Sequence, residues 1–139
     1  MTIANDPKIR LDKMKPQERF DLLQDLDCVC CWLAEQHGLD RTDLPEEIHH
    51  LNMGGQPGKK RRGHRYTIKL CVFHHKGSFN GLPAPSGQDG VDWLEEKAAI
   101  HGPSWAQSAR RFREFYGTDD YLLELTDRAL LNGWPTYEE

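Results

Sequence analysis

Four possible metal ligands occur in two pairs, and each pair has two residues between its members. Cys28 and Cys31 form a C-x-x-C pair, and forty residues further along Cys71 and His74 form a C-x-x-H pair. Zinc takes four ligands of these types in closed, tetrahedral structural sites. The two-residue gap lets both side chains of a pair converge on one ion. The spacing therefore predicts a structural zinc that joins the N-terminal segment to the later pair.

The cysteines also allow other interpretations. Spacing alone leaves open a zinc site that uses Cys30, the fourth cysteine, in place of a neighbour. Reduced cysteines can instead be buried as small hydrophobic residues, which is what we expect of Cys30. Thiol–disulfide chemistry through Cys28 and Cys31 is a further interpretation. It gives His74 no role, and nothing else in the sequence indicates a redox βαβ domain.

Two pairs of adjacent histidines follow, in "EIHHL" (47–51) and "LCVFHH" (70–75). If His74 is a zinc ligand, three histidines of these pairs have no assigned role, namely His49, His50 and His75. Adjacent residues of a strand face opposite sides, so His49 and His50 are not simple ligands of one ion. One can hold a divalent ion while the other takes a proton from water, as in metal-assisted phosphodiester hydrolysis. The alternative is that the histidine pairs are polar surface residues.

A basic stretch lies between the two histidine-bearing segments. "GKKRRGHR" (58–65) contains five cations and no acid: Lys59, Lys60, Arg61, Arg62 and Arg65. The chain as a whole has a net charge of −4. We therefore expect a polyanion to bind at one face of the protein, where these cations gather. Contacts to phosphates supply affinity but little sequence information, so we expect DNA binding with weak sequence preference. The alternative is a solvated surface loop.

The elements expected to position these groups are two short strands and several helices. Helical spacing or helix signals occur over 16–27, 91–102, 103–117 and 119–133, and strand signals occur over 47–51 and 66–73. The cysteines at 28–31 are expected to form a tight turn that leads into a short apolar segment. A Gly-rich loop joins the strands, and a turn or short helix is expected to begin at His74.

Length and composition limit the class of protein. The 139 residues fit one domain, and 37% of them are hydrophobic. This is a modest apolar supply, to which a bound metal would add stability. No stretch approaches the roughly 20 apolar residues of a membrane span, and the N-terminus lacks an apolar signal region. We therefore predict a cytoplasmic protein without a membrane partner.

Together these motifs resemble the HNH endonuclease family, also called the ββα-metal or His-Me finger family. "CVCC", "EIHHL", the Gly-rich loop and "IKLCVFHH" are similar to its C-x-x-C, its strand ending in a D/H-His pair, and its "LCxxCH". Here His74 occupies the place of the last cysteine. That variant and the downstream "HG…FREFYG" are most similar to the phage recombination-enhancement nucleases that depend on RecA, the Ref-like branch. The resemblance covers about residues 28–117.

The resemblance implies an α+β fold with a small ββα-metal core, a clamp of two zinc knuckles, and flanking helices. It implies a single HNH-like nuclease domain over 1–139. Within it we expect a flexible segment over 1–15, a core over about 20–117, and a C-terminal helix and tail over 118–139.

The resemblance also implies roles for single residues. His49 would be the first metal ligand, His50 the general base, and His75 a metal ligand on the helix after the second strand. The catalytic ion would be zinc, magnesium or manganese, beside the structural zinc. His101, in "AIHG", resembles a downstream histidine of the Ref-like branch. It would add a ligand to the catalytic metal or contact a phosphate, and the alternative is a surface histidine at a helix end.

One family residue is missing from the sequence. The middle asparagine of the HNH motif, which orients the base, is replaced by Tyr66, flanked by Arg65 and Thr67. Thr67 or a backbone carbonyl would have to take its place. The expected function is a metal-dependent DNA endonuclease that acts in phage or bacterial recombination. Its partners would be DNA and, by resemblance only, a RecA-type filament. The alternative is a zinc-stabilised, non-catalytic DNA-binding or adaptor module.

Overall fold

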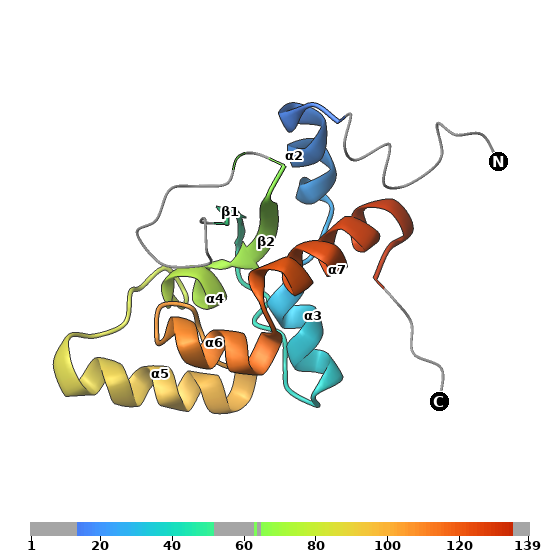
Figure 1. Ribbon diagram of the computed structural model, residues 1–139. Coiled ribbons are helices and arrows are strands. Elements are labelled where there is room, and N and C mark those ends of the chain that lie inside the picture. The colour runs from blue at the N-terminus through green and yellow to red at the C-terminus, as the bar shows by residue number, and fades with distance from the viewer. Residues whose placement is uncertain (1–13, 52–62, 64, 135–139) are drawn as a thin grey trace.

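A small antiparallel sheet lies at the centre of the molecule and helices surround it (Figure 1). The computed structural model describes residues 14–51, 63 and 65–134. Its elements in chain order are α2 (Pro16–Gln24), α3 (Val29–Gln36), β1 (Glu46–His50), β2 (Thr67–Cys71), α4 (Val72–Lys76), α5 (Gly87–His101), α6 (Ala109–Tyr116) and α7 (Asp119–Asn132). The fold is α+β, as the sequence predicts.

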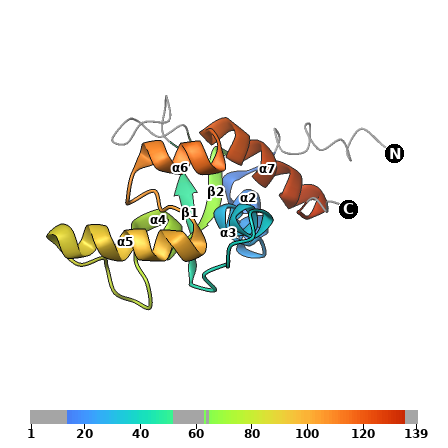
Figure 2. The ribbon, with the colours of Figure 1, turned by 90° about the horizontal axis from the view of Figure 1, so that it is seen from below.

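The two strands form a hairpin whose register places the histidines. His49 lies opposite Ile68, and the next residue, His50, lies opposite Thr67. Residues that lie opposite each other in a sheet share a face, and successive residues of a strand alternate between faces. The side chains of His49 and Ile68 therefore lie on one face, and those of His50 and Thr67 on the other. Figure 2 shows the sheet between α5 and α6 on one side and α2, α3 and α7 on the other. Every residue of β2 is buried, because helices cover both faces of the sheet.

The second strand is shorter than the predicted range 66–73. β2 ends at Cys71, and α4 begins at the next residue. The Cys71 sulfur accepts a hydrogen bond from the backbone N–H of His74, at 3.4 Å, and so caps the helix. This cap and the full burial of Phe73 outweigh the strand preference of Val72 and Phe73. The chain thus runs strand, strand, helix, with no loop before the helix.

The cysteine segment is more helical than predicted. The apolar residues after Cys28 form α3, whose first six residues are all buried. The Cys28 sulfur caps this helix by accepting a hydrogen bond from the backbone N–H of Cys31, at 3.3 Å. No glycine or proline interrupts Val29–Gln36, so the turn of the knuckle continues as a helix.

The C-terminal helices follow the predicted order, with different starting points. α5 begins at Gly87, before the predicted start at 91. α6 begins at Ala109, after the predicted start at 103, because Ser108 caps it through the backbone N–H of Arg111.

Gly102 follows α5 directly and has a positive φ of +86°. A Cβ at this position would lie 2.4 Å from the Tyr116 hydroxyl. Only glycine fits this close approach.

The main core joins α3, β2, α4, α6 and α7. It contains the fully buried side chains of Val29, Leu70, Phe73, Phe112 and Leu122. A smaller cluster, with Leu23 and Ala129, lies between α2 and α7. Within the described part of the chain, no helix combines the length and the apolar character needed to cross a membrane.

A buried arginine connects α2 to the sheet and to α7. Arg19 is 4% exposed and donates hydrogen bonds to the hydroxyl and the carbonyl oxygen of Thr67, at 2.9 and 2.6 Å. It also forms an ion pair of 2.8 Å with Asp127. Because Thr67 lies opposite His50, these bonds fix the strand at the level of the histidines.

Replacing Arg19 with methionine is expected to lower the free energy of unfolding by about 2–3 kcal/mol, because it removes a charged donor from a buried site. Urea unfolding of the purified protein measures this. Arg128→Met is the matched control, since it breaks an exposed i,i+4 pair with Glu124 that is worth about 0.5 kcal/mol at most. Equal losses in the two variants would contradict a structural role for Arg19.

Candidate active site

The structure brings the four predicted zinc ligands together. The ligand atoms of Cys28, Cys31, Cys71 and His74 all lie within 4.8 Å of one another, and all four side chains are buried. The Nδ1 atom of His74 lies 3.1 Å from the Cys71 sulfur and 3.6 Å from each of the other two sulfurs. Among the described residues, this is the one group of three or more possible ligands so close together.

The orientation of His74 suits metal binding. Its Nε2 atom lies 2.9 Å from the carbonyl oxygen of His101, which can only accept a hydrogen bond. The proton is therefore on Nε2, and the lone pair of Nδ1 faces the three sulfurs. Histidine ligands commonly donate their second N–H in this way. The residues present thus fit a zinc ion in donor type, number and orientation.

Burial and hydrogen bonding shift the pKa values of Cys28 and Cys71 in opposite directions. Hydrogen bonds from Cys28 and Cys31 lower the pKa of the Cys71 thiol to about 3. Burial raises the pKa of the Cys28 thiol well above its usual value. A bound cation would therefore replace protons held by the cluster. Burial also raises the pKa of Cys30, which is fully buried and stands outside the ligand group, as expected of a small hydrophobic residue.

A second group of imidazoles lies between β1 and α4. The Nδ1 atom of His49 and the Nε2 atom of His75 are 3.0 Å apart, and the ring centroids are separated by 4.7 Å. Both side chains are partly buried. Two imidazole nitrogens that face each other can bind one divalent ion, with water or phosphate oxygens as the remaining ligands. His74 and His75 are consecutive residues of α4. The first belongs to the sulfur cluster and the second to the histidine pair.

Glu47 joins the histidine pair, although the sequence analysis did not single it out. One carboxylate oxygen lies 3.0 Å from His75 Nδ1 and the other lies 2.8 Å from Lys76 Nζ. Lys76, and then His75, hold the pKa of the Glu47 carboxyl below its ordinary value. One feature of the sequence could have indicated this contact. Side chains alternate along a strand, so Glu47 lies on the same face of β1 as His49.

His50 lies on the other face of β1. It is opposite Thr67 in the register, and its ring meets the ring of Phe20 edge-on at a centroid distance of 6.2 Å. Phe20 belongs to α2, whereas the partner of His49 belongs to α4. The structure therefore brings His49 and His75 together and directs His50 to the opposite side of the strand.

His101 lies beside the sulfur cluster rather than with the histidine pair. Its ring Nδ1 donates to the carbonyl oxygen of Asp40 at 2.7 Å, and its ring packs on Phe73 and Phe79. It is 8% exposed, and its own carbonyl receives the hydrogen bond from His74. It does not form a close ligand group with His49 and His75 among the described residues.

Most of the predicted basic patch lies outside the described residues, namely Lys59, Lys60, Arg61 and Arg62. Arg65 is described, is exposed, and stacks on the ring of Tyr66 at 5.5 Å. It directly precedes β2.

Aromatic and basic side chains of the α6 region reach the histidine pair. The Trp105 ring lies 5.9 Å from the His49 ring, and the Arg113 guanidinium lies over Trp105 at 5.4 Å. The neighbouring Arg110 is paired with Glu114 on the same helix. Arg113 thus connects α6 to the His49 ring through the ring of Trp105.

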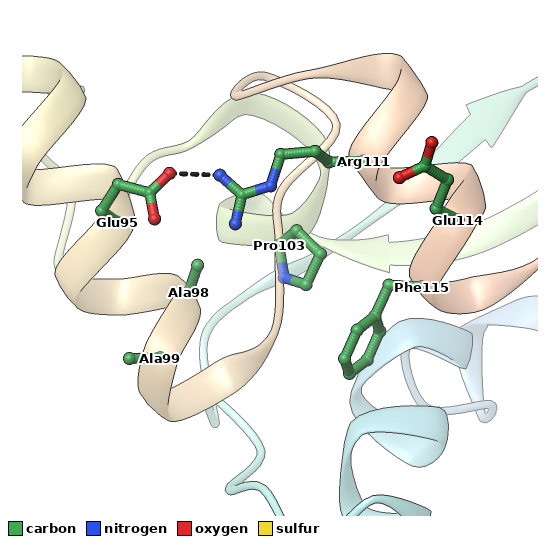
Figure 3. Close-up of a pocket in the computed structure, with 7 residues that line it drawn as sticks. All are labelled: Glu95, Ala98, Ala99, Pro103, Arg111, Glu114 and Phe115. Atoms are coloured by element: carbon green, nitrogen blue, oxygen red, sulfur yellow. Dashed lines mark hydrogen bonds and ion pairs between the residues drawn. The ribbon is translucent and has the colours of Figure 1, made fainter.

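A separate pocket of about 390 Å³ lies between α5 and α6. Figure 3 shows Arg111 of α6 reaching Glu95 of α5 across it, with Pro103 and Phe115 on its walls. None of the described site residues lines this pocket.

The comparisons with known proteins identify a family. A family model described as "Recombination enhancement, RecA-dependent nuclease" matches residues 14–131, which is most of the chain. The matched region contains both the sulfur cluster and the histidine pair. No curated protein and no solved structure gave a match. The match confirms the resemblance to recombination-enhancement nucleases that depend on RecA, and the chain belongs to the recombination-enhancement, RecA-dependent nuclease family.

Proposed function

We propose that the protein is a metal-dependent DNA endonuclease of the HNH, or ββα-metal, type. The observation that carries this proposal is the pair of facing nitrogens on His49 and His75, 3.0 Å apart, on a strand–strand–helix unit. Membership in a nuclease family supports it independently. His49 and His75 would hold the divalent ion, which can be zinc, magnesium or manganese.

The proposed reaction is hydrolysis of a phosphodiester bond. When bound, the ion would stabilise the charge on the scissile phosphate and on the leaving oxygen. His50 is proposed to take the proton from the attacking water. It follows His49 directly at the end of β1 and faces the other way, so it does not compete for the ion. Thr67, opposite His50, is proposed to replace the family asparagine in positioning the base.

The sulfur cluster is proposed to hold a structural zinc that positions the active site. Zinc bound to His74 would fix α4, and the next residue of this helix is His75. The cluster is closed by four protein ligands, which is the arrangement of structural rather than catalytic zinc. His101 then supports the zinc through its carbonyl oxygen rather than binding the catalytic ion.

The proposed substrate is DNA, bound mainly through its phosphates. The predicted contacts are Lys59, Lys60, Arg61, Arg62 and Arg65. On the side of α6, Arg113 lies over Trp105 beside His49 and is proposed as a further phosphate contact. The description of the family implies that a RecA-type filament is the partner on the DNA.

One observation favours a second function. The resemblance places Tyr66 where the family has the asparagine that orients the base, and the ring of Tyr66 packs against the main core. A chain without a well-positioned base would be a zinc-stabilised DNA-binding module that recruits other proteins.

A nuclease assay separates the two functions. The purified, zinc-loaded protein is incubated with single-stranded, duplex and recombinase-coated DNA in the presence of Mg²⁺, Mn²⁺ or Zn²⁺. We expect cleavage that requires a divalent ion, stops with EDTA, and is strongest on recombinase-coated DNA. Binding to DNA with every substrate left intact under all these conditions would instead support the non-catalytic module.

A further inference from the structure

We propose that Glu47 is a positioning residue that fixes the proton and the orientation of His75, so that His75 Nε2 is available as a metal ligand. This inference rests on the proposed function, because it assigns a role within the proposed catalytic metal site. It concerns a residue that neither the motifs nor the family description assigns. The two nitrogens of the His75 ring face different groups.

The ring of His75 has different partners on its two sides. Nδ1 lies 3.0 Å from a carboxylate oxygen of Glu47, and Nε2 lies 3.0 Å from Nδ1 of His49. An ionised carboxylate only accepts hydrogen bonds, so Nδ1 must carry the proton. A neutral imidazole has one N–H, which leaves the lone pair on Nε2 directed toward His49. This tautomer is the one that a metal ligand at Nε2 requires.

The remaining contacts of Glu47 keep its carboxylate in this role. Its second oxygen is bound by Lys76 at 2.8 Å, and Lys76 follows His75 directly on α4. The two consecutive side chains therefore hold both carboxylate oxygens. Because Glu47 and His49 share a face of β1, the strand supplies one proposed ligand and the orienting group for the other.

The ion pair itself contributes little to stability. Lys76 is 56% exposed and the Glu47 side chain is 30% exposed. Ion pairs this exposed add little to stability, because water screens the charges and both long side chains lose rotational freedom. A role in stability alone therefore predicts that loss of the carboxylate changes little, whereas a positioning role predicts a change in metal affinity.

The test compares Glu47→Gln and Glu47→Asp with the wild type, each loaded with its structural zinc. Titration with Mn²⁺ by calorimetry is expected to show an affinity reduced by about 10–100-fold in Glu47→Gln, the usual effect of losing such a partner. Glu47→Asp, which keeps the carboxylate, is expected to recover part of this loss. Glu114→Gln is the matched control, because it removes an exposed carboxylate paired with Arg110. It is expected to bind Mn²⁺ as the wild type does.

A second measurement does not need the catalytic metal. Long-range ¹⁵N–¹H NMR of the zinc-loaded, Mn²⁺-free protein reports which nitrogen of His75 carries the proton. We expect the Nδ1–H form in the wild type and a mixture of both forms in Glu47→Gln. If the wild type binds no Mn²⁺, the proposed metal site is wrong, and the NMR comparison alone decides the role of Glu47. An unchanged tautomer, or an unchanged Mn²⁺ affinity in Glu47→Gln, would overturn the inference.

Discussion

Cys31→Ala is expected to lose its zinc and most of its folded population. The Cys31 sulfur is one of four buried ligand atoms that lie within 4.8 Å of one another. Structural zinc contributes an apparent binding free energy of about 10–16 kcal/mol in small domains at neutral pH, which is as large as the whole stability of a typical domain. Opening the closed site therefore removes a contribution that this small core cannot replace. Zinc content by mass spectrometry and unfolding followed by circular dichroism measure the effect.

Cys30→Ala is the matched control for this prediction. Cys30 is the neighbouring residue, is also buried, and stands outside the ligand group. Its replacement removes one sulfur from the core, so we expect one zinc per chain and a loss of roughly 1 kcal/mol. If Cys31→Ala keeps a full zinc and wild-type stability while Cys30→Ala loses them, the ligand set contains the wrong cysteine.

The sequence predicts the sulfur cluster well because the geometry of each knuckle is local. In both knuckles the first cysteine caps a helix, and its sulfur accepts a hydrogen bond from the backbone N–H three residues later. The helix cap and the third helical residue lie on one side of the first turn, so a C-x-x-C or C-x-x-H spacing suffices to direct both ligands to one point. The strand pair is also predictable, from the short apolar and β-branched segments on either side of the Gly-rich loop.

The sequence does not predict contacts that depend on tertiary packing. Glu47 meets His75 only because the hairpin places β1 beside α4, and no local spacing encodes that distance. The resemblance implies that His101 adds a ligand to the catalytic metal or contacts a phosphate, whereas its contacts with Asp40, Phe73 and Phe79 place it beside the sulfur cluster. The predicted end of β2 is wrong for a different reason, because the cap formed by Cys71 is local, and together with the burial of Phe73 it outweighs the strand preference of Val72 and Phe73.

His50→Ala is expected to lower the rate of DNA cleavage by about 10²–10⁴-fold at saturating divalent metal, the usual contribution of a general base. The residue lies on the face of β1 opposite His49, and the centroid of its ring lies 6.2 Å from that of Phe20. Its loss should therefore leave zinc content, Mn²⁺ affinity and DNA binding at wild-type values. Single-turnover cleavage of recombinase-coated DNA, with metal titrations in parallel, measures these quantities separately.

His75→Ala is expected to lose cleavage because it loses the divalent ion. The contrast with His50→Ala separates a metal ligand from a general base. This change removes one of the facing nitrogens, so Mn²⁺ affinity should fall, and cleavage should be lost together with it. Zinc content should remain at one per chain, because His74 keeps its place in the sulfur cluster. If His50→Ala cleaves DNA normally while His75→Ala does not, the base is another group on the His49 face of the sheet. If His50→Ala instead loses Mn²⁺ affinity, His50 is a metal ligand, and the separation of the two faces does not hold in the working enzyme.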